Sequence, residues 1–204
     1  MAPQQRFVIG ISAPSGGGKT TVARQLVARL PDAVLLSFDD YDHLTVHPAS
    51  YPQWLAEGAD YNAWQTPQLS ADLRRLRAGQ AIVAPRTGQV VSPRAYIVFD
   101  APLGRAHHET GQQIDLMVFI DTPLDVAMAR RLLRDYSQNE RSLSHKWAQI
   151  QSELAVYLAS GRAAYLEMDR QIKPGCDLIL DGLRSPDELA LEILVRIPEM
   201  HKEN

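Results

Sequence analysis

The chain contains a single cysteine and no hydrophobic run of membrane-spanning length. Cys176 is the one cysteine among 204 residues, which excludes an internal disulfide and is typical of a reducing compartment. It follows Lys-Pro-Gly at the start of an apolar run, and we interpret it as a buried structural thiol rather than a nucleophile. The first residues form no apolar signal segment. We therefore expect a cytoplasmic protein that has no membrane partner.

An excess of charge of either sign is also missing. The formal net charge is −3, so no overall field attracts nucleic acid, and we expect no nucleic-acid partner. The sequence shows no internal repeat and no low-complexity tract. With 45% hydrophobic residues, a chain of this length can bury one sizeable core, and we expect a single domain over residues 1–204. Whether the protein forms a homo-oligomer stays open at this stage.

A glycine-rich turn near the start of the chain organises the rest of the sequence. Residues 13–20 read APSGGGKT and lie between an apolar run at 7–11 and a helical pattern at 21–30. A strand, a glycine-rich turn ending in Lys-Thr and a helix form the context of a phosphate-binding loop. Glycines let successive N–H groups point into one concavity, to which the helix N-terminus adds its own N–H groups. The predicted nucleotide-binding residues are Ser15, Gly16, Gly17, Gly18, Lys19, Thr20 and Thr21.

Two side chains of this turn have predicted chemical roles. Lys19 is expected to reach the outer phosphates of a nucleotide, and the Thr20 hydroxyl is expected to ligate Mg²⁺. Ala13 stands where the pattern G-x-x-x-x-G-K-[ST] has its first glycine, which is tolerable if its φ is negative. The alternative interpretation is a glycine-rich turn that carries a surface lysine. The strand before the turn and the helix after it count against that alternative.

Two later apolar runs end in aspartate. Residues 33–38 lead into Asp39, and residues 95–99 lead into Asp100. Polar residues at the carboxyl ends of parallel strands lie at the edge where open α/β sheets bind ligands. We therefore predict that Asp39 is the general base and takes part in Mg²⁺ handling, and that Asp100 orients Mg²⁺. The alternative is turn chemistry, because Asp favours strand exits and helix caps.

Arginine is enriched over residues 130–146, where we expect a lid. Arg130 and Arg134 are four residues apart and share one helix face. Such a segment suits closure over phosphates and supplies positive charge to the transferring group. The predicted catalytic residues are therefore Asp39, Lys19, Arg130 and Arg134. The alternative is an ordinary solvated helix face.

The acceptor side of the site is expected in two excursions, residues 40–68 and 85–94. The first is loop-like and rich in proline and aromatic residues, so it could hold an acceptor substrate or simply pack onto the body of the protein. The polar loop after Asp100 adds two candidates at the same sheet edge, while the adjacent His107 and His108 lack partners at the spacing of a zinc site. The predicted acceptor contacts are Asp40, Tyr41, Tyr61, Trp64, Arg86, Arg105 and His107.

Apolar strands alternate with helical patterns along the chain. The predicted strands are 7–11, 33–38, 95–99, 114–121 and 176–181, and a hairpin is predicted over 81–91. The predicted helices are 21–30, 70–79, 123–135, 147–171 with Gly161 as a break, and a final helix that opens with the capping box at 185–188. This alternation predicts an α/β fold, with a five-stranded parallel sheet and helices on both faces.

The motifs together are similar to those of a known family. They are Gly-Lys-Thr-Thr at 18–21, the strands that end in Asp39 and Asp100, and Phe-Ile-Asp-Thr-Pro-Leu-Asp at 119–125 with Arg-Arg-Leu-Leu-Arg-Asp at 130–135. They resemble the uridine kinase-like group of P-loop kinases, which includes uridine, nicotinamide riboside and pantothenate kinases and phosphoribulokinase. The resemblance covers residues 6–197. It implies a three-layer P-loop NTPase fold with an arginine-rich lid.

The same resemblance implies an ATP-dependent phosphotransferase that uses Mg²⁺ and acts on a hydroxyl group of a small metabolite, with uridine or a related nucleoside first. The resemblance implies the same roles that are predicted above for the turn, for Asp39 and Asp100, and for the lid arginines Arg130 and Arg134. The chain departs from the group on the acceptor side. Where the group commonly has Ser-Phe-Tyr after the base, this chain has Asp40-Tyr41-Asp42, and where the group commonly has Glu, this chain has Asp100. Arg86-Thr87-Gly88 replaces a segment that contains a Tyr and a His and contacts nucleosides in uridine kinases.

The acceptor therefore stays open at the level of sequence. Nicotinamide riboside, pantothenate and a sugar phosphate are alternatives to uridine. An acceptor-independent P-loop ATPase or switch is an alternative from another class. The guanine signature Asn-Lys-x-Asp and the switch signature Asp-x-x-Gly are both missing, which counts against that class.

Overall fold

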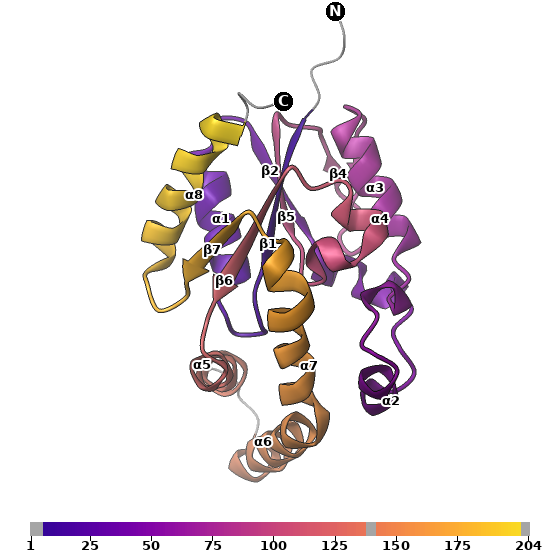
Figure 1. The fold of residues 1–204 in the computed structure, drawn as a ribbon, viewed down its shortest axis with the longest axis vertical. Coiled ribbons are helices and arrows are strands. Elements are labelled where there is room, and N and C mark those ends of the chain that lie inside the picture. Colours follow the sequence, from indigo (N-terminus) through magenta and orange to yellow (C-terminus); the bar gives the residue numbers. More distant parts are fainter. Residues whose placement is uncertain (1–5, 138–141, 201–204) are drawn as a thin grey trace, which may run out of the picture.

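A five-stranded parallel sheet lies at the centre of the protein (Figure 1). The computed structural model describes residues 6–137 and 142–200. The strands follow the spatial order β2-β5-β1-β6-β7, and every neighbouring pair is parallel. They are β1 (Phe7–Ser12), β2 (Ala33–Ser37), β5 (Tyr96–Asp100), β6 (Leu116–Asp121) and β7 (Leu178–Asp181). The predicted sheet is confirmed, because each of the five apolar runs forms one of its strands.

Helices cover both faces of this sheet and produce three layers (Figure 1). Those on one face are α1 (Lys19–Arg29) and α8 (Pro186–Met200), and those on the other are α3 (Pro67–Arg77) and the short α4 (His108–Gly111). Side chains of β1 alternate between the faces, so Ile9 joins one buried cluster with α1 and α8 while Val8 joins the other with α3. A strand buried on both faces needs a continuous apolar run, which is why these strands are readable from the sequence.

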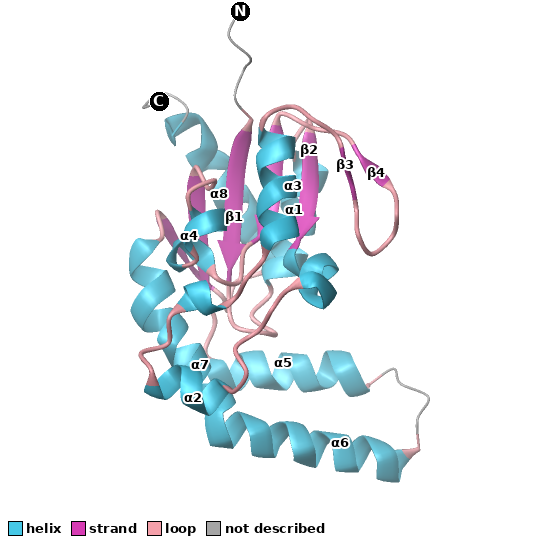
Figure 2. Cartoon of the chain, turned by 90° about the vertical axis from the view of Figure 1, so that its right-hand side faces the viewer, coloured by secondary structure: helices cyan, strands magenta, loops and turns pink. Residues whose placement is uncertain are grey.

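Several helices collect beyond the carboxyl end of the sheet (Figure 2). They are α2 (Tyr51–Ala56), α5 (Leu124–Tyr136), α6 (Leu143–Val156) and α7 (Arg162–Glu167), and a 3₁₀ segment at Phe38–Leu44 follows β2. The predicted hairpin is also present, as an antiparallel pair of β3 (Ile82–Val83) and β4 (Val90–Val91) separate from the main sheet. Open α/β sheets bind their ligands at this carboxyl end.

Part of the predicted loop-like excursion at 40–68 consists of short helices. The Ser50 hydroxyl accepts a hydrogen bond from the Gln53 amide (3.3 Å) at the start of α2, and Pro52 occupies the first turn. Asp60 caps a further 3₁₀ turn at Tyr61–Ala63 in the same way. Serine, aspartate and proline also start ordinary turns, so the sequence alone does not distinguish a loop from a series of short helices here.

The helical pattern predicted over 147–171 begins earlier, because the Ser142 side chain caps α6 and the helix starts at Leu143. Gly161, a predicted break, keeps helical dihedral angles (φ −61°, ψ −41°), although the chain changes direction between α6 and α7 (Figure 1). Two π-helical turns flank α7, at Tyr157–Gly161 and Met168–Ile172. None of the described helices is long and apolar enough to cross a membrane.

Candidate active site

The glycine-rich turn is held by two other elements. Gly16 and Gly18 have positive φ angles (85° and 100°), a conformation that L side chains rarely adopt. The buried Thr122 hydroxyl, just after β6, donates to the Gly17 carbonyl (2.9 Å). A Cβ atom on Gly16 would lie 2.1 Å from the Ala127 carbonyl oxygen of α5. The turn therefore requires glycine at Gly16 both for its backbone conformation and for its close approach to α5.

Helix α1 begins directly after the turn without a side-chain cap. Gly18 occupies the N-cap position and Lys19 is the first helical residue. The first N–H groups of a helix have no partner within the helix, and with the positive end of the helix dipole they form an anion site. The strand–turn–helix arrangement on which the prediction for residues 15–21 depends is thus present.

A cavity of about 410 Å³ lies beside the turn. Arg130 and Arg134 of α5 line it, and Arg130 Nη1 is held by the Gly182 carbonyl after β7 (2.9 Å). Arg184 lines it as well and pairs with Glu192 of α8. No sequence signal singles out Arg184, which lies between β7 and α8 and is positioned by this pair. Residues 16–22, Pro186 and Leu189 complete the wall.

Asp100 lies buried at the end of β5, close to two side chains of the turn. The Thr20 hydroxyl donates to Asp100 Oδ2 (3.1 Å), and Lys19 Nζ lies 3.8 Å from Oδ1. Asp100 Oδ1 is buried and has no hydrogen-bond partner. Burial raises the pKa of Asp100, while the positive charge of Lys19 opposes that shift and the negative charge of Asp39 adds to it.

A buried carboxylate oxygen that accepts no hydrogen bond, beside a hydroxyl group, fits Mg²⁺, the cation that the kinase resemblance implies. Mg²⁺ prefers oxygen ligands and is usually held by one or two protein groups, with phosphate oxygens and water as the others. Among residues 6–137 and 142–200, no three His, Cys, Asp or Glu side chains form a group that could hold a metal ion by themselves. A cation here would therefore depend on Thr20 and Asp100 together with phosphate oxygens.

A second cavity, of about 300 Å³, adjoins the first. Lys19, Thr20 and Arg134 line both cavities, so the two spaces meet at these side chains. Asp39, which follows β2, lines the second cavity only. The pKa of Arg134 is raised, mainly by its hydrogen bonds to Asp135 and further by the charge of Asp39. A carboxylate, an ammonium group and a guanidinium group thus gather where one cavity opens into the other.

Aromatic side chains form much of the remaining wall of the second cavity. Trp54 packs edge-on against Trp64 and Tyr61 (ring centroids 4.9 and 5.3 Å apart), and Tyr61 stacks on Trp64 (5.8 Å). Tyr61 and Trp64 are predicted residues, and the structure places both in this wall. The lining residues that sequence reasoning missed are Ala13, Phe38, Asp42, His47, Tyr51, Trp54, Pro102, Leu103, Ala164, Tyr165 and Met168. The aromatic composition of the 40–68 excursion could have indicated Tyr51 and Trp54, whereas the later helical segment gives no such signal.

Three predicted acceptor contacts from the two excursions lie outside both cavities. Tyr41 is buried (2% exposed), and its hydroxyl donates to Asp72 Oδ2 of α3 (3.1 Å). Asp40 and Arg86 lie at the surface and face one another at 4.0 Å. Successive side chains of the 3₁₀ segment point in different directions, so Asp39 faces the cavity while Tyr41 faces the core. Tyr41 is accordingly a packing residue, and Asp40 and Arg86 form a surface pair.

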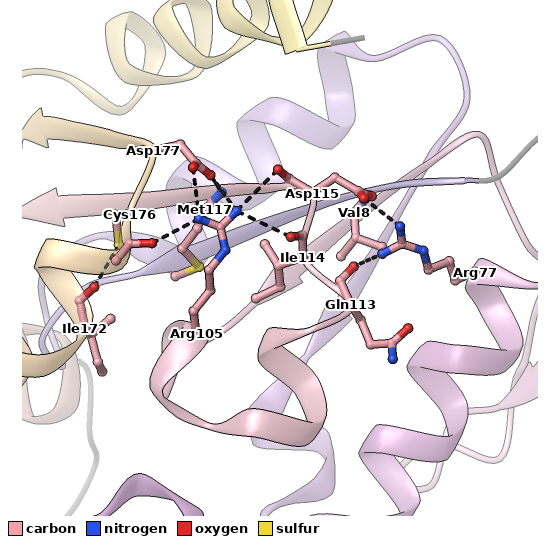
Figure 3. A network of polar contacts seen from close by, with 11 residues as sticks. Val8, Arg77, Arg105, Gln113, Ile114, Asp115, Met117, Ile172, Cys176 and Asp177 are labelled. Carbon is pink, nitrogen blue, oxygen red and sulfur yellow. Dashed lines mark hydrogen bonds and ion pairs between the residues drawn. The ribbon is translucent and has the colours of Figure 1, made fainter. Parts of the chain in front are cut away.

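Arg105, another predicted acceptor contact, belongs to a different part of the molecule (Figure 3). Its guanidinium group binds both carboxylate oxygens of Asp177 (2.9 and 2.7 Å) and the Gly175 carbonyl (3.0 Å). Asp177 also accepts from the Met117 amide (2.7 Å), at the amino ends of β6 and β7. The long side chain therefore reaches back to the sheet edge opposite the cavities. The structure does not bring Arg105 to either cavity.

The same network continues to α3 through Arg77 (Figure 3). Arg77 Nη2 lies 2.6 Å from Asp115 Oδ1, and the other oxygen of Asp115 accepts from the Val8 amide (2.8 Å). These contacts join α3, β1 and the start of β6. They support the sheet from the edge where no ligand is proposed.

His107, also predicted to contact the acceptor, is buried behind the aromatic wall (2% exposed). Its Nε2 lies 3.0 Å from the Trp64 carbonyl and its Nδ1 lies 2.7 Å from the Thr110 hydroxyl. Because a carbonyl only accepts, Nε2 donates and Nδ1 accepts. Burial lowers the pKa of His107 and favours this neutral form. His107 supports Trp64 and does not line either cavity.

The predicted lid corresponds to α5 and the start of α6. Arg131, on α5, binds Glu153 of α6 (3.2 Å), and the Tyr136 hydroxyl donates to the same carboxylate. One face of α5 thus presents Arg130 and Arg134 to the first cavity, while Arg131 holds α6. Residues 138–141 of the predicted lid lie outside the described residues.

The sequence of this chain is similar to those of known uridine kinases. No protein-family model matches the chain. A uridine kinase of Borrelia turicatae is 29% identical over 185 residues, which cover 85% of this chain and 85% of that protein. A uridine kinase of Leuconostoc citreum is 29% identical over 189 residues, which cover 85% and 86%. The resemblance that the motifs predict is confirmed, because similarity to uridine kinases extends over most of the chain.

Solved structures show the same fold at lower identity. The tunicamycin resistance protein of Deinococcus radiodurans superposes with a TM-score of 0.53 at 18% identity, over 95% of this chain and 96% of that one. The shikimate kinase of Bacteroides thetaiotaomicron superposes with a TM-score of 0.52 at 13% identity, over 95% and 98%. The predicted three-layer fold of P-loop kinases is therefore confirmed.

Proposed function

From the premise that this chain has the P-loop kinase fold and is similar in sequence to uridine kinases, we propose that it is an ATP-dependent phosphotransferase acting on a hydroxyl group of a small metabolite. The observation that carries the proposal is the junction of the two cavities at Lys19, Thr20 and Arg134, with Asp39 in the wall of the second. The first cavity takes the nucleotide and the second takes the acceptor.

Charge in the first cavity suits a phosphate chain. The N–H groups of the turn and of α1, together with Lys19 and Arg130, bind phosphate oxygens. Mg²⁺, held by Thr20 and Asp100, would offset negative charge on those oxygens. Phosphoryl transfer depends mainly on positioning and charge stabilisation, so these groups supply most of what the reaction needs.

Asp39 is the proposed base on the acceptor side. Its carboxylate accepts the proton of the acceptor hydroxyl as the hydroxyl oxygen forms a bond to the terminal phosphorus, and the bond between that phosphorus and the leaving oxygen of ADP breaks. Lys19 and Arg134 offset the charge that spreads over the transferred group. Arg134 is oriented for this by its hydrogen bonds to Asp135 (2.7 and 3.1 Å).

A nucleoside is the proposed acceptor. Among the described residues that line the second cavity, Lys19 and Arg134 are the Lys and Arg side chains, and both are shared with the nucleotide cavity. An acceptor with its own phosphate or carboxylate would lack a separate Lys or Arg and would lie near Asp39 and Asp42. The aromatic wall instead suits a flat ring. Uridine and nicotinamide riboside meet these conditions better than pantothenate or a sugar phosphate.

An acceptor screen tests the proposal. ADP release from Mg-ATP is measured with uridine, cytidine, nicotinamide riboside, pantothenate and a sugar phosphate in turn. We expect a nucleoside to stimulate release, and Asp39→Asn to lower that turnover by about two to four orders of magnitude, the range for removing a general base. Asp40→Asn is the matched control, because Asp40 lies outside both cavities and should keep most of the turnover.

Two outcomes of the screen would contradict the proposal. ADP release that is independent of every acceptor would favour the ATPase or switch alternative. Near-normal turnover of Asp39→Asn would remove Asp39 from the role of base.

A further inference from the structure

The 3₁₀ segment at Phe38–Leu44 carries two carboxylates on the side that faces the second cavity. In a 3₁₀ helix, residues three apart in the sequence lie on the same side. Phe38 and Tyr41 are accordingly both buried in the core (7% and 2% exposed). Asp39 and Asp42 are both exposed and line the second cavity, the proposed acceptor cavity. Sequence reasoning gives a role to Asp39 alone, so the second carboxylate has none yet.

The Asp42 carboxylate is accessible to a ligand in this cavity, since its side chain is 63% exposed. Among the residues that the structure describes, His47 is its ion-pair partner, with Nε2 3.2 Å from Oδ1. This contact leaves Oδ2 to accept hydrogen bonds from a ligand. Burial raises the pKa of Tyr51, a further lining residue, with smaller contributions from Tyr165 and from the negative charge of Asp42. The charge of Asp42 thus acts on the wall of the cavity.

Hydrogen bonds on the core side hold this segment in place. The Tyr41 hydroxyl donates to Asp72 Oδ2 of α3 (3.1 Å), and the Thr45 hydroxyl donates to the Tyr41 carbonyl (3.0 Å). The Thr45 amide donates to the Asp42 carbonyl (3.1 Å). The backbone that carries the two carboxylates is therefore fixed before a ligand binds, which lowers the cost of binding.

The spacing and the chemistry of the two carboxylates restrict what binds at Asp42. Asp39 and Asp42 are one turn apart, which is about 6 Å along the axis of a 3₁₀ helix. With Asp39 on the hydroxyl group that is phosphorylated, Asp42 faces a part of the acceptor about one sugar ring away. An ionised carboxylate accepts hydrogen bonds and donates none, and it disfavours an anionic group beside it. A further hydroxyl group of the acceptor satisfies these conditions.

We propose that Asp42 determines acceptor specificity by accepting hydrogen bonds from further hydroxyl groups of the acceptor, which in a nucleoside are the 2′- and 3′-hydroxyls of the ribose. The inference rests on the proposed function and narrows its substrate class to polyhydroxylated acceptors such as ribonucleosides. An acceptor without these hydroxyls offers no donor to the carboxylate. Hydrogen bonds to a charged group are stronger than those between neutral groups, so their loss is measurable.

The test compares two acceptors. They are the best ribonucleoside of the screen and its 2′,3′-dideoxy analogue, which keeps the 5′-hydroxyl and the base. We expect the wild-type protein to prefer the ribonucleoside by about tenfold or more in kcat/KM. Asp42→Ala should remove most of that preference, mainly through a higher KM for the ribonucleoside, while its activity with the dideoxy analogue and its KM for ATP stay nearly unchanged. Asp42→Asn, which keeps one oxygen as an acceptor but no charge, should retain part of the preference.

Asp40→Ala is the matched control, because Asp40 belongs to the same segment but lies outside both cavities. It removes a carboxylate of the same kind and should leave the acceptor preference intact. Both Asp40 and Asp42 lie at the surface of the segment, so both alanine variants should melt close to the wild-type temperature. An equal loss of preference in the two alanine variants would mean that the charge of the segment, and not a contact with Asp42, selects the acceptor.

Failure of the inference and failure of the proposed function give different results. If the wild-type protein releases no ADP with any nucleoside, the proposed function is wrong and the inference falls with it. If the wild-type protein is active but uses the dideoxy analogue equally well, the inference alone is wrong. The same holds if Asp42→Ala keeps the preference or loses activity equally on both acceptors.

Discussion

Among the described residues, three buried side-chain atoms have no hydrogen-bond partner: Arg6 Nε, the Tyr61 hydroxyl and Asp100 Oδ1, of which Asp100 Oδ1 lies where Mg²⁺ is proposed to bind. An unpaired buried polar group costs about 1–3 kcal/mol, so folding by itself does not favour such positions. Nearby buried polar groups are paired, including the hydroxyl of Tyr41 and both ring nitrogens of His107. At the scale of residues, the paired polar atoms of Tyr41 and His107 identify side chains that support the fold.

The pH dependence of stability should contain a contribution from His107. Burial lowers its pKa in the folded protein, whereas the unfolded imidazole titrates near about 6.5. As the pH falls below about 6.5, the unfolded state takes up a proton that the folded state does not, so the free energy of unfolding decreases. This loss has a limiting slope of about 1.4 kcal/mol per pH unit.

We therefore expect His107→Asn to be less stable than the wild type at neutral pH but to lose less stability on acidification. Urea unfolding between about pH 8 and pH 5 measures both, and the difference between the two proteins isolates His107 from the other histidines. Parallel curves for the two proteins would mean that His107 does not titrate differently on folding.

At the scale of elements, the phosphate-binding turn and α5 depend on each other. The close approach of Gly16 to the Ala127 carbonyl leaves no room for a side chain. A helix that carries Arg130 and Arg134 thus rests directly on the turn that is proposed to bind the same phosphates. The contact sets the position of these two arginines relative to the turn.

Alanine substitutions at two glycines of the turn test this contact. Both Gly16 and Gly18 have left-handed backbone conformations, in which alanine costs about 1–2 kcal/mol. A Cβ at Gly18 meets nothing within 4 Å, whereas a Cβ at Gly16 meets the backbone of α5. Gly16→Ala should therefore lower the free energy of unfolding more than Gly18→Ala. If chemical denaturation shows that both substitutions lower the free energy of unfolding equally, the contact between the turn and α5 does not contribute to stability.

At the scale of the whole molecule, the two cavities join segments that are far apart in the sequence. The turn after β1, Asp39 after β2, Arg134 of α5 and Tyr165 of α7 all reach the second cavity or its junction with the first. A ligand at this junction binds the folded state and has no equivalent site in the unfolded chain. Nucleotide binding should therefore stabilise the protein as a whole.

Thermal unfolding with Mg-ATP measures this stabilisation. At a free concentration of about 100 times Kd, the gain is about 2.7 kcal/mol, or roughly 5–10 °C in melting temperature for a chain of this size. Lys19→Ala should reduce the shift, because Lys19 lines both cavities. An unchanged melting temperature of the wild-type protein would contradict nucleotide binding. An equal shift in the wild type and in Lys19→Ala would mean that the nucleotide binds away from Lys19.

Much of the fold and part of the candidate site could be predicted from local sequence. The apolar runs predict all five strands, and the turn at 13–20 predicts where α1 begins. Asp39 and Asp100 were predictable because residues that follow parallel strands come to one edge of the sheet. The capping box at Ser185 is also present, since Ser185 and Glu188 bond reciprocally.

Side-chain direction was not predictable in the same way. Tyr41 lies two residues after Asp39 and points into the core, and Arg105 follows β5 yet reaches the opposite edge of the sheet. Arg184 and Tyr165 join the cavities although nothing in the sequence near them indicates a site. The directions of Tyr41, Arg105 and Arg184 depend on a charged partner distant in the sequence, which is Asp72, Asp177 or Glu192 respectively.

The sequence by itself determined the succession of strands and helices along the chain, the phosphate-binding turn and the two carboxylates at strand ends. The reason is that hydrophobic periodicity and backbone conformation depend on a few neighbouring residues. Only the tertiary structure decided which side chains line the acceptor cavity and which hydroxyl group is left without a partner. The physical reason is that a buried side chain takes the direction in which packing and hydrogen bonds to distant elements are satisfied, and those partners exist only after the layers have come together.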